Sequence, residues 1–285
     1  MSRFIEIVEV GPRDGLQNEK RTVPTADKIR LVDMASACGF ERIEAASFVS
    51  PRWVPQMADA AEVLAGIDRR PGTRYAALTP NRQGLEAAIE AGADEVAIFG
   101  SASEAFSKAN INCTIAESLE RFGPVLERAR QVGLPVRGYI SCVVACPYSG
   151  PVEPASVADL AGKLLALGCY EVSLGDTIGA GTPDTVGAML DAVLPLVPAR
   201  LLAGHYHDTN GRALDNIEAS LARGLRVFDA SLGGLGGCPY APGAKGNVDT
   251  IAVCDRLDAL GYRAGLDPAR LAEAAAFARS LRPEA

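Results

Sequence analysis

The most constraining feature of this sequence is the regular alternation of short aliphatic runs with longer amphipathic segments. The short runs have the length and composition of buried strands, whereas the longer segments repeat apolar residues with the period of a helix. The expected strands are Ile5–Val10, Arg42–Ser47, Arg74–Thr79, Glu95–Gly100, Val136–Cys142, Glu171–Asp176, Leu201–Asp208 and Val227–Leu232. The expected helices are Thr25–Cys38, Glu86–Ala91, Glu117–Val132, Ser156–Leu167, Pro183–Leu194, Asn210–Arg223, Asn247–Leu260 and Asp267–Leu281.

Strands and helices that alternate in this way over 285 residues predict an α/β fold, a single (β/α)8 TIM barrel. We therefore interpret residues 1–285 as one catalytic domain, with the active site at the C-terminal ends of the strands and an extra C-terminal helix on the outside. The alternative is an open doubly wound sheet. Such a sheet would normally carry a G-x-G-x-x-G fingerprint after its first strand, where this chain has GPRDG.

Composition narrows the functional class. Apolar residues make up 48% and charged residues 22%, which is typical of a globular protein, and only 6% aromatic residues indicate an aliphatic core. A net charge of −7 without a Lys/Arg run argues against nucleic acid as a partner. No apolar stretch approaches the roughly 20 residues of a membrane span. The seven scattered cysteines indicate reduced thiols and a cytoplasmic location. The first apolar run contains acidic residues, so we do not expect a signal peptide.

The two histidines of the chain are His205 and His207, at the end of the seventh expected strand. Side chains at i and i+2 of a strand point to the same face, here the mouth of the expected barrel. Neutral imidazoles are common ligands of divalent metals. Asp14 can add an oxygen ligand from the end of the first strand, and Asn247 an amide oxygen. A mixed set of this kind suits Mg²⁺ or Mn²⁺ better than structural zinc.

Further candidates lie at the other strand ends. Arg13 follows the first strand, where a guanidinium can hold a carboxylate or stabilise an oxyanion, although an Arg–Asp pair can also be a plain salt bridge. Glu44 and Asp176 are candidates for proton transfer, with buried structural carboxylates as the alternative. Lys108 and Asn110 follow the fourth strand and can bind the polar part of a larger ligand.

The segment Gly233–Gly246 reads GGLGGCPYAPGAKG and is too rich in Gly and Pro for a helix or a central strand. It is either a solvated loop or a lid over the substrate. Its thiol, Cys238, is the best placed of the cysteines for acid–base chemistry, because a lid residue meets both solvent and substrate. The residues alone thus suggest a metal-dependent lyase or aldolase of the barrel type.

Blocks along nearly the whole chain resemble the hydroxymethylglutaryl-CoA lyase family. They include VEVGPRDGLQNEK, SEAFSKANINC, SLGDTIGAGTP, HYHDTNG and, most specifically, GLGGCPYA. The resemblance implies a TIM barrel that cleaves 3-hydroxy-3-methylglutaryl-CoA to acetyl-CoA and acetoacetate with Mg²⁺ or Mn²⁺. The metal ligands it implies are Asp14, His205, His207 and Asn247, and the catalytic residues are Arg13, Cys238, Glu44 and Asp176.

In the chemistry that the resemblance implies, Arg13 stabilises the enolate of acetyl-CoA and Cys238 protonates it after a retro-Claisen cleavage. The implied partner is an acyl-CoA, and barrels of this kind often form homodimers. One position departs from the family, which usually has Glu where this chain has Ile251. Three alternatives therefore stay open: a lyase for another 3-hydroxy-3-alkylglutaryl-CoA or for citramalyl-CoA, a Claisen-type acyltransferase that joins acetyl-CoA to a 2-oxo acid, and a binding protein without turnover.

Overall fold

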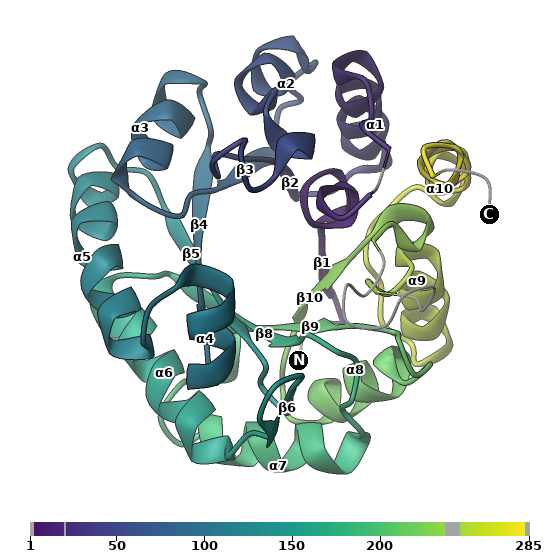
Figure 1. The fold of residues 1–285 in the computed structure, drawn as a ribbon. Coiled ribbons are helices and arrows are strands. Elements are labelled where there is room, and N and C mark those ends of the chain that lie inside the picture. The colour runs from purple at the N-terminus through teal and green to yellow at the C-terminus, as the bar shows by residue number, and fades with distance from the viewer. Residues whose placement is uncertain (1–2, 20, 237–245, 283–285) are drawn as a thin grey trace.

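Eight parallel strands close into a barrel in the computed structural model, which describes residues 3–19, 21–236 and 246–282. Their order around the barrel is β1-β10-β9-β8-β5-β4-β3-β2, and the parallel pairing of β1 with β10 completes the ring. Figure 1 looks along the barrel and shows the helices as an outer layer around the strands. The barrel strands are β1 (Glu6–Glu9), β2 (Arg42–Ser47), β3 (Arg74–Leu78), β4 (Glu95–Ser101), β5 (Val136–Ser141), β8 (Glu171–Asp176), β9 (Leu202–Tyr206) and β10 (Val227–Ala230).

The outer helices follow the strands in chain order, as the sequence pattern predicts, although no helix was predicted between β2 and β3. They are α1 (Thr25–Cys38), α2 (Ala60–Gly66), α3 (Arg82–Glu90), α5 (Ile115–Gln131), α6 (Pro154–Leu167), α7 (Pro183–Val193), α8 (Ala213–Ala222) and α9 (Thr250–Ala259). The extra C-terminal helix, α10 (Pro268–Ser280), packs against α1. The predicted (β/α)8 barrel is therefore confirmed, and so is the additional helix.

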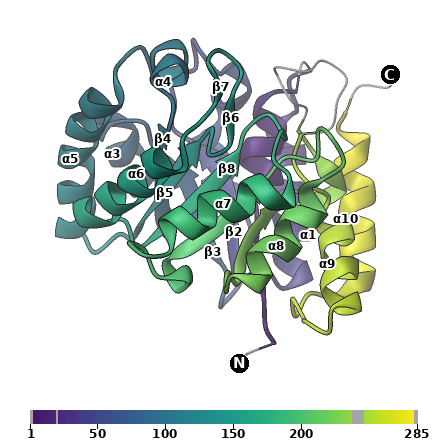
Figure 2. The same cartoon turned by 90° about the horizontal axis from the view of Figure 1, so that it is seen from below.

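Three elements at one end of the barrel were not predicted. They are helix α4 (Glu104–Ile111), inserted between β4 and α5, and a small antiparallel hairpin of β6 (Ala145–Cys146) and β7 (Gly150–Pro151). Figure 2 shows them at the end of the barrel opposite the N-terminus, where β4 and β5 finish. Together with the loops after the other strands they surround the mouth of the barrel.

Some helix boundaries differ from the prediction because side chains cap the helices. The last helix of the barrel, expected from Asn247, begins at Thr250, because the Asp249 carboxylate accepts hydrogen bonds from the backbone N–H groups of Ile251 and Ala252. The helix expected from Glu86 begins at Arg82, where the Asn81 side chain accepts from the N–H of Gly84. The helix expected from Asn210 begins at Ala213, where the N-cap residue, Arg212, makes no side-chain cap.

The core has two parts with different chemistry. Between strands and helices it is aliphatic, as the low aromatic content predicts. Inside the barrel, however, charged side chains are buried: Arg42 and Arg137 are each 2% exposed or less, and both pair with Glu171. A charge can be buried in this way only when it is paired and hydrogen-bonded. The interior of the barrel is thus an ionic network that leads towards the mouth.

Candidate active site

Three of the predicted metal ligands converge at the barrel mouth. Asp14, His205 and His207 each place one potential ligand atom within 4.8 Å of the others. Asp14 comes from a single π-helical turn, Gly11–Gly15, that directly follows β1. The two imidazole rings stand 5.3 Å apart between centroids, at the end of β9. The prediction that His205 and His207 share one face of a strand end is confirmed.

Asn247 joins this cluster because its segment of chain returns to the strand ends. Its backbone pairs with that of His207, and its Nδ2 donates to Oδ2 of Asp14 over 2.9 Å. The backbone carbonyl of Val248 then accepts from the N–H of Ser231, next to the end of β10. Residues more than 200 positions apart in the sequence therefore meet at one point of the barrel mouth.

The donor set of this cluster fits a divalent cation. Among the described residues, the Nδ1 atom of His207 is buried and has no hydrogen-bond partner, although such an atom normally has one. Burial and the neighbouring His205 lower the pKa of His207 to about 4, so its ring is neutral at pH 7 and has a free lone pair. Burial alone would raise the pKa of Asp14, but Arg13 and the two histidines hold it at about 2. One carboxylate with two imidazoles is a donor set that Mg²⁺ and Mn²⁺ accept.

Arg13 lies beside this cluster as an almost fully buried cation. Its Nε donates to Oε2 of Glu44 over 2.7 Å, and its Nη1 to Oδ1 of Asp14 over 2.6 Å. The guanidinium carbon also stands 5.7 Å from the ring centroid of Tyr139. Burial raises the pKa of Glu44 against the opposing effect of Arg13, and Glu44 Oε1 has no hydrogen-bond partner among the described residues. The structure thus brings the predicted residues Arg13 and Glu44 next to the predicted metal ligands.

Buried Glu9 holds the turn that presents Arg13 and Asp14. Its Oε1 accepts from the backbone N–H groups of Gly11 and Leu232, at 2.9 Å each, and its Oε2 accepts from the Thr250 hydroxyl. A side chain at Gly11 would not fit, because a Cβ there would lie 2.5 Å from Glu9 Oε1. Burial raises the pKa of Glu9 to about 8. This support, which connects β1 with β10 and α9, was not predicted from the sequence.

Two further side chains of the site were not predicted. Asp229, on β10, is within 3.1 Å of Nδ1 of His205, and Arg137, on β5, is within 2.7 Å of Asp229. Each interrupts an aliphatic strand, in VFDA and VRGYIS. A charged residue in a strand buried on both faces is the signal that could have identified them, because such a residue needs a partner inside the barrel.

Asp176 is placed at the end of β8, where its carboxylate binds backbone amides of its own loop. Oδ2 accepts from the N–H of Gly181 over 2.7 Å and Oδ1 from that of Ala180 over 3.1 Å. Burial raises its pKa, against these hydrogen bonds and the nearby His205. The contacts correspond to the alternative of a buried structural carboxylate, and a part in proton transfer stays a prediction.

Two of the remaining candidates lie apart from this cluster. Lys108 and Asn110 are exposed on α4, at the rim of the mouth. Cys238 lies outside the described residues. Ile251, the position at which the family usually has Glu, is in the first turn of α9 and packs against the aliphatic core.

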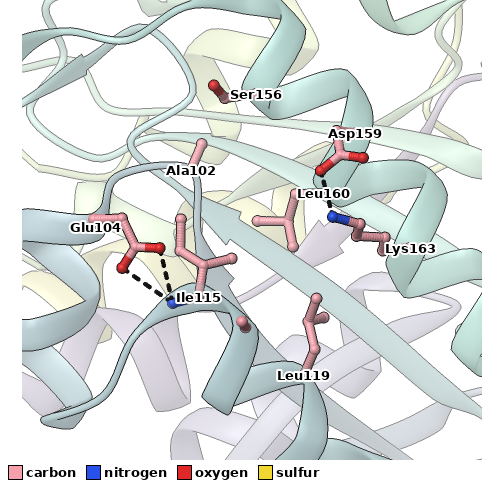
Figure 3. Close-up of a pocket in the computed structure, with 9 residues that line it drawn as sticks. Ala102, Glu104, Ile115, Leu119, Ser156, Asp159, Leu160 and Lys163 are labelled. Atoms are coloured by element: carbon pink, nitrogen blue, oxygen red, sulfur yellow. Dashed lines mark hydrogen bonds and ion pairs between the residues drawn. The ribbon is translucent and has the colours of Figure 1, made fainter.

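A separate cavity of about 490 Å³ lies outside the barrel, between α4, α5 and α6 (Figure 3). Its lining is mixed: Leu119 and Leu160 lie beside Glu104 and an ion pair between Asp159 and Lys163. None of the described site residues lines it. Within the described part of the chain, no helix is both long and apolar enough to cross a membrane.

Comparison with known proteins gives consistent relatives. The family model described as HMGL-like matches residues 4–278. A protein of Pseudomonas aeruginosa named 3-hydroxy-3-isohexenylglutaryl-CoA/hydroxy-methylglutaryl-CoA lyase is 60% identical over 96% of this chain and 91% of its own. The crystal structure of the HMG-CoA lyase from Brucella melitensis has a TM-score of 0.98 and 65% identity over 99% of both chains. An HMG-CoA lyase from Acinetobacter baumannii, in complex with coenzyme A and 3-methylmalate, has a TM-score of 0.93 and 38% identity over 99% of this chain and 92% of its own.

These matches extend over the elements that build the site, from β1 to α10. The resemblance of the sequence blocks and the likeness of the whole fold therefore agree, and the chain belongs to the HMGL-like family.

Proposed function

We propose that this protein is a hydroxymethylglutaryl-CoA lyase, which cleaves 3-hydroxy-3-methylglutaryl-CoA to acetyl-CoA and acetoacetate with Mg²⁺ or Mn²⁺. One observation carries this proposal: a buried guanidinium, Arg13, stands directly beside a cluster of one carboxylate and two imidazoles at the mouth of a (β/α)8 barrel. The names of the two similar enzymes from Pseudomonas and Brucella support the same substrate class.

Asp14, His205 and His207 would hold the ion, with Asn247 as the fourth ligand through its amide oxygen. The amide of Asn247 stands against Asp14, to which its nitrogen donates, and its oxygen would turn to the ion when the amide acts as a ligand. When bound, a divalent cation acts as a Lewis acid that polarises oxygen atoms of the substrate.

Cleavage of the carbon–carbon bond leaves negative charge on the enolate of acetyl-CoA, and this charge has to be stabilised. Arg13 supplies a fixed cation for it, because Glu44 and Asp14 hold the guanidinium in one orientation and it does not have to reorganise during the reaction. Burial raises the pKa of Glu44, and its unpaired Oε1 is free to exchange a proton with a bound substrate. Cys238 would then donate the proton that completes the methyl group of acetyl-CoA.

The proposal also includes the contacts with coenzyme A, the oligomeric state and the location of the protein. Lys108 and Asn110 are exposed on α4 and would bind the polar part of coenzyme A. We also expect a homodimer and a cytoplasmic location. A second candidate substrate is a 3-hydroxy-3-alkylglutaryl-CoA with a longer side chain, because the relative from Pseudomonas is named for two such substrates.

A panel of acyl-CoA substrates tests the assignment. The protein is incubated with 3-hydroxy-3-methylglutaryl-CoA, 3-hydroxy-3-isohexenylglutaryl-CoA and citramalyl-CoA, and the products are identified by mass spectrometry. The proposal expects acetoacetate and acetyl-CoA from the first substrate. Cleavage of citramalyl-CoA alone, or of none of the three by folded and metal-bound protein, would refute it. Release of free CoA from acetyl-CoA and a 2-oxo acid would instead indicate an acyltransferase.

A further inference from the structure

Asp229 occupies an unusual place next to the metal-ligand cluster. It belongs to β10, it is 3% exposed, and its carboxylate contacts three side chains from three other strands. Oδ2 accepts from the Ser173 hydroxyl over 2.8 Å and lies 3.1 Å from Nδ1 of His205, whereas Oδ1 accepts from Nη2 of Arg137 over 2.7 Å. Both oxygens of the carboxylate therefore have polar partners, and these partners hold the group in one orientation.

The contact with Asp229 decides which nitrogen of His205 carries the hydrogen. An ionised carboxylate can only accept a hydrogen bond, so the ring nitrogen that faces it, Nδ1, has to be the donor. In the neutral ring the other nitrogen, Nε2, then has a free lone pair. It points towards the cluster, with 4.0 Å between it and Oδ2 of Asp14. This is the tautomer that a metal ligand needs.

The ionic network beneath Asp229 keeps this arrangement rigid. Arg137 cannot rotate away from Asp229, because its Nε also donates to Glu171 over 2.7 Å and its Nη1 to the Tyr139 hydroxyl over 2.9 Å. Arg137 also balances the negative charge of Asp229, which is otherwise costly to bury. The interior of the barrel thus fixes the orientation of one imidazole at its mouth.

We infer that Asp229 is a positioning residue of the metal site: it holds the His205 ring in the tautomer and orientation in which Nε2 binds the cation. This inference rests on the metal site of the proposed function, but not on the identity of the substrate. The competing interpretation is that Asp229 is only the counter-ion of Arg137 and stabilises the barrel.

A matched pair of substitutions separates the two interpretations. Asp229→Asn and Glu171→Gln each neutralise one carboxylate partner of the same buried arginine, Arg137, with almost no change in shape. Only Asp229 contacts His205. Both variants should lose thermal stability. The dissociation constant for Mn²⁺, measured by calorimetry with the full chain, should rise about 10- to 100-fold in Asp229→Asn and change less than about threefold in Glu171→Gln.

Equal Mn²⁺ affinities of wild type and Asp229→Asn, at reduced stability, would show that Asp229 is only a counter-ion and would overturn the inference. Because calorimetry needs no turnover, this result is independent of whether the enzyme cleaves the proposed substrate.

A second measurement uses the wild-type protein and does not depend on the folding of a variant. The chain has two histidines, so ¹⁵N-labelled imidazoles give a spectrum with two spin systems. Against the effect of burial, Asp229 and Asp14 raise the pKa of His205, so the spectrum of the metal-free protein is recorded at a pH alkaline enough for the ring to be neutral. The inference predicts that the neutral ring then carries its hydrogen on Nδ1. A spectrum in which His205 carries its hydrogen on Nε2 would contradict the inference.

Ser173→Ala removes one hydrogen bond from Asp229 and leaves its carboxylate in place. This variant should raise the Mn²⁺ dissociation constant less than Asp229→Asn does.

Discussion

The carboxylate of Glu44 holds the guanidinium of Arg13 in a buried ion pair, with 2.7 Å between Oε2 and Nε, at the mouth of the barrel. A second carboxylate, Asp14, binds another nitrogen of the same guanidinium and is also part of the metal-ligand cluster. Arg13 therefore connects the charge of the proposed metal site with the position where negative charge develops on the substrate. The predictions below follow from this connection.

Arg13→Lys tests the role of the guanidinium. Lysine carries its charge and its three donors on a single nitrogen, so it cannot reproduce the planar geometry in which the guanidinium binds Glu44 and Asp14 while it also faces the substrate. We expect kcat for cleavage to fall about 100- to 1000-fold, as for the loss of other groups that stabilise an oxyanion. The matched control is Arg30→Lys, on the outer surface beside Phe277, which should keep the wild-type kcat. An Arg13→Lys enzyme with near-normal kcat would remove Arg13 from the mechanism.

Asp14→Asn tests the metal site. The substitution keeps the shape of the side chain but removes the only charged oxygen of the Asp14, His205 and His207 cluster. We expect the Mn²⁺ dissociation constant, measured by calorimetry, to rise more than about 100-fold. This increase is larger than the roughly 10- to 100-fold increase that is typical when a residue that only orients a ligand is lost. Asp159→Asn, at an exposed site on α6, serves as the control. Equal affinities of the two variants would mean that the cation binds elsewhere.

Glu9→Gln tests the buried carboxylate under the Gly11–Gly15 turn. Because burial raises its pKa from 4.5 to about 8, the folded protein keeps this proton over a pH range in which the unfolded chain has lost it. The stabilising contribution is therefore complete below pH 4.5 and is lost as the pH rises through about 8. Linkage limits the slope for one proton to about 1.4 kcal/mol per pH unit.

The glutamine variant mimics the protonated acid, since its oxygen accepts from Gly11 and Leu232 and its nitrogen donates to Thr250. Urea unfolding at a series of pH values should show a steeper loss of stability in wild type than in Glu9→Gln as the pH rises from about 5 to 8. Parallel curves for the two proteins would show that Glu9 is ionised in the folded state throughout this range.

Cys238→Ser tests the proposed proton donor. A hydroxyl is a far weaker acid than a thiol, so kcat should fall at least about 100-fold, in the range typical of general acids. The Mn²⁺ affinity and the melting temperature should stay unchanged, because the thiol is not among the proposed ligands. Cys254→Ser, on α9, provides a cysteine control that should keep its activity. A fully active Cys238→Ser enzyme would show that another group donates the proton.

Most of the architecture could be predicted because strands and helices of a barrel have different sequence periods. Two strands, Arg42–Ser47 and Glu171–Asp176, and the helix Thr25–Cys38 have the predicted boundaries. Short elements could not be predicted in this way. Helix α4 has only eight residues, begins at a Ser103 cap and ends at Asn112 in the left-handed region, so its apolar period is too short to be recognised.

The convergence of Arg13, Asp14, His205 and His207 could be predicted because all four follow the ends of barrel strands. The supporting residues Glu9, Arg137 and Asp229 lie within strands, and their partners come from distant parts of the chain. The bond between Arg137 and Asp229, for example, spans 92 positions. The sequence pattern indicates that a charged residue is unusual within a buried strand, but only the closed barrel shows which group pairs with that charge.

Metal reconstitution of the cleavage reaction tests the central claim most directly. The protein is stripped with a chelator, and acetoacetate formed from 3-hydroxy-3-methylglutaryl-CoA is followed as Mn²⁺ or Mg²⁺ is added to wild type and to Asp14→Asn. The account predicts no product without metal, a turnover of about 1–10³ s⁻¹ for reconstituted wild type, and none for Asp14→Asn at the same metal concentration. Full turnover in the presence of the chelator, or no cleavage by wild type with metal bound, would contradict it.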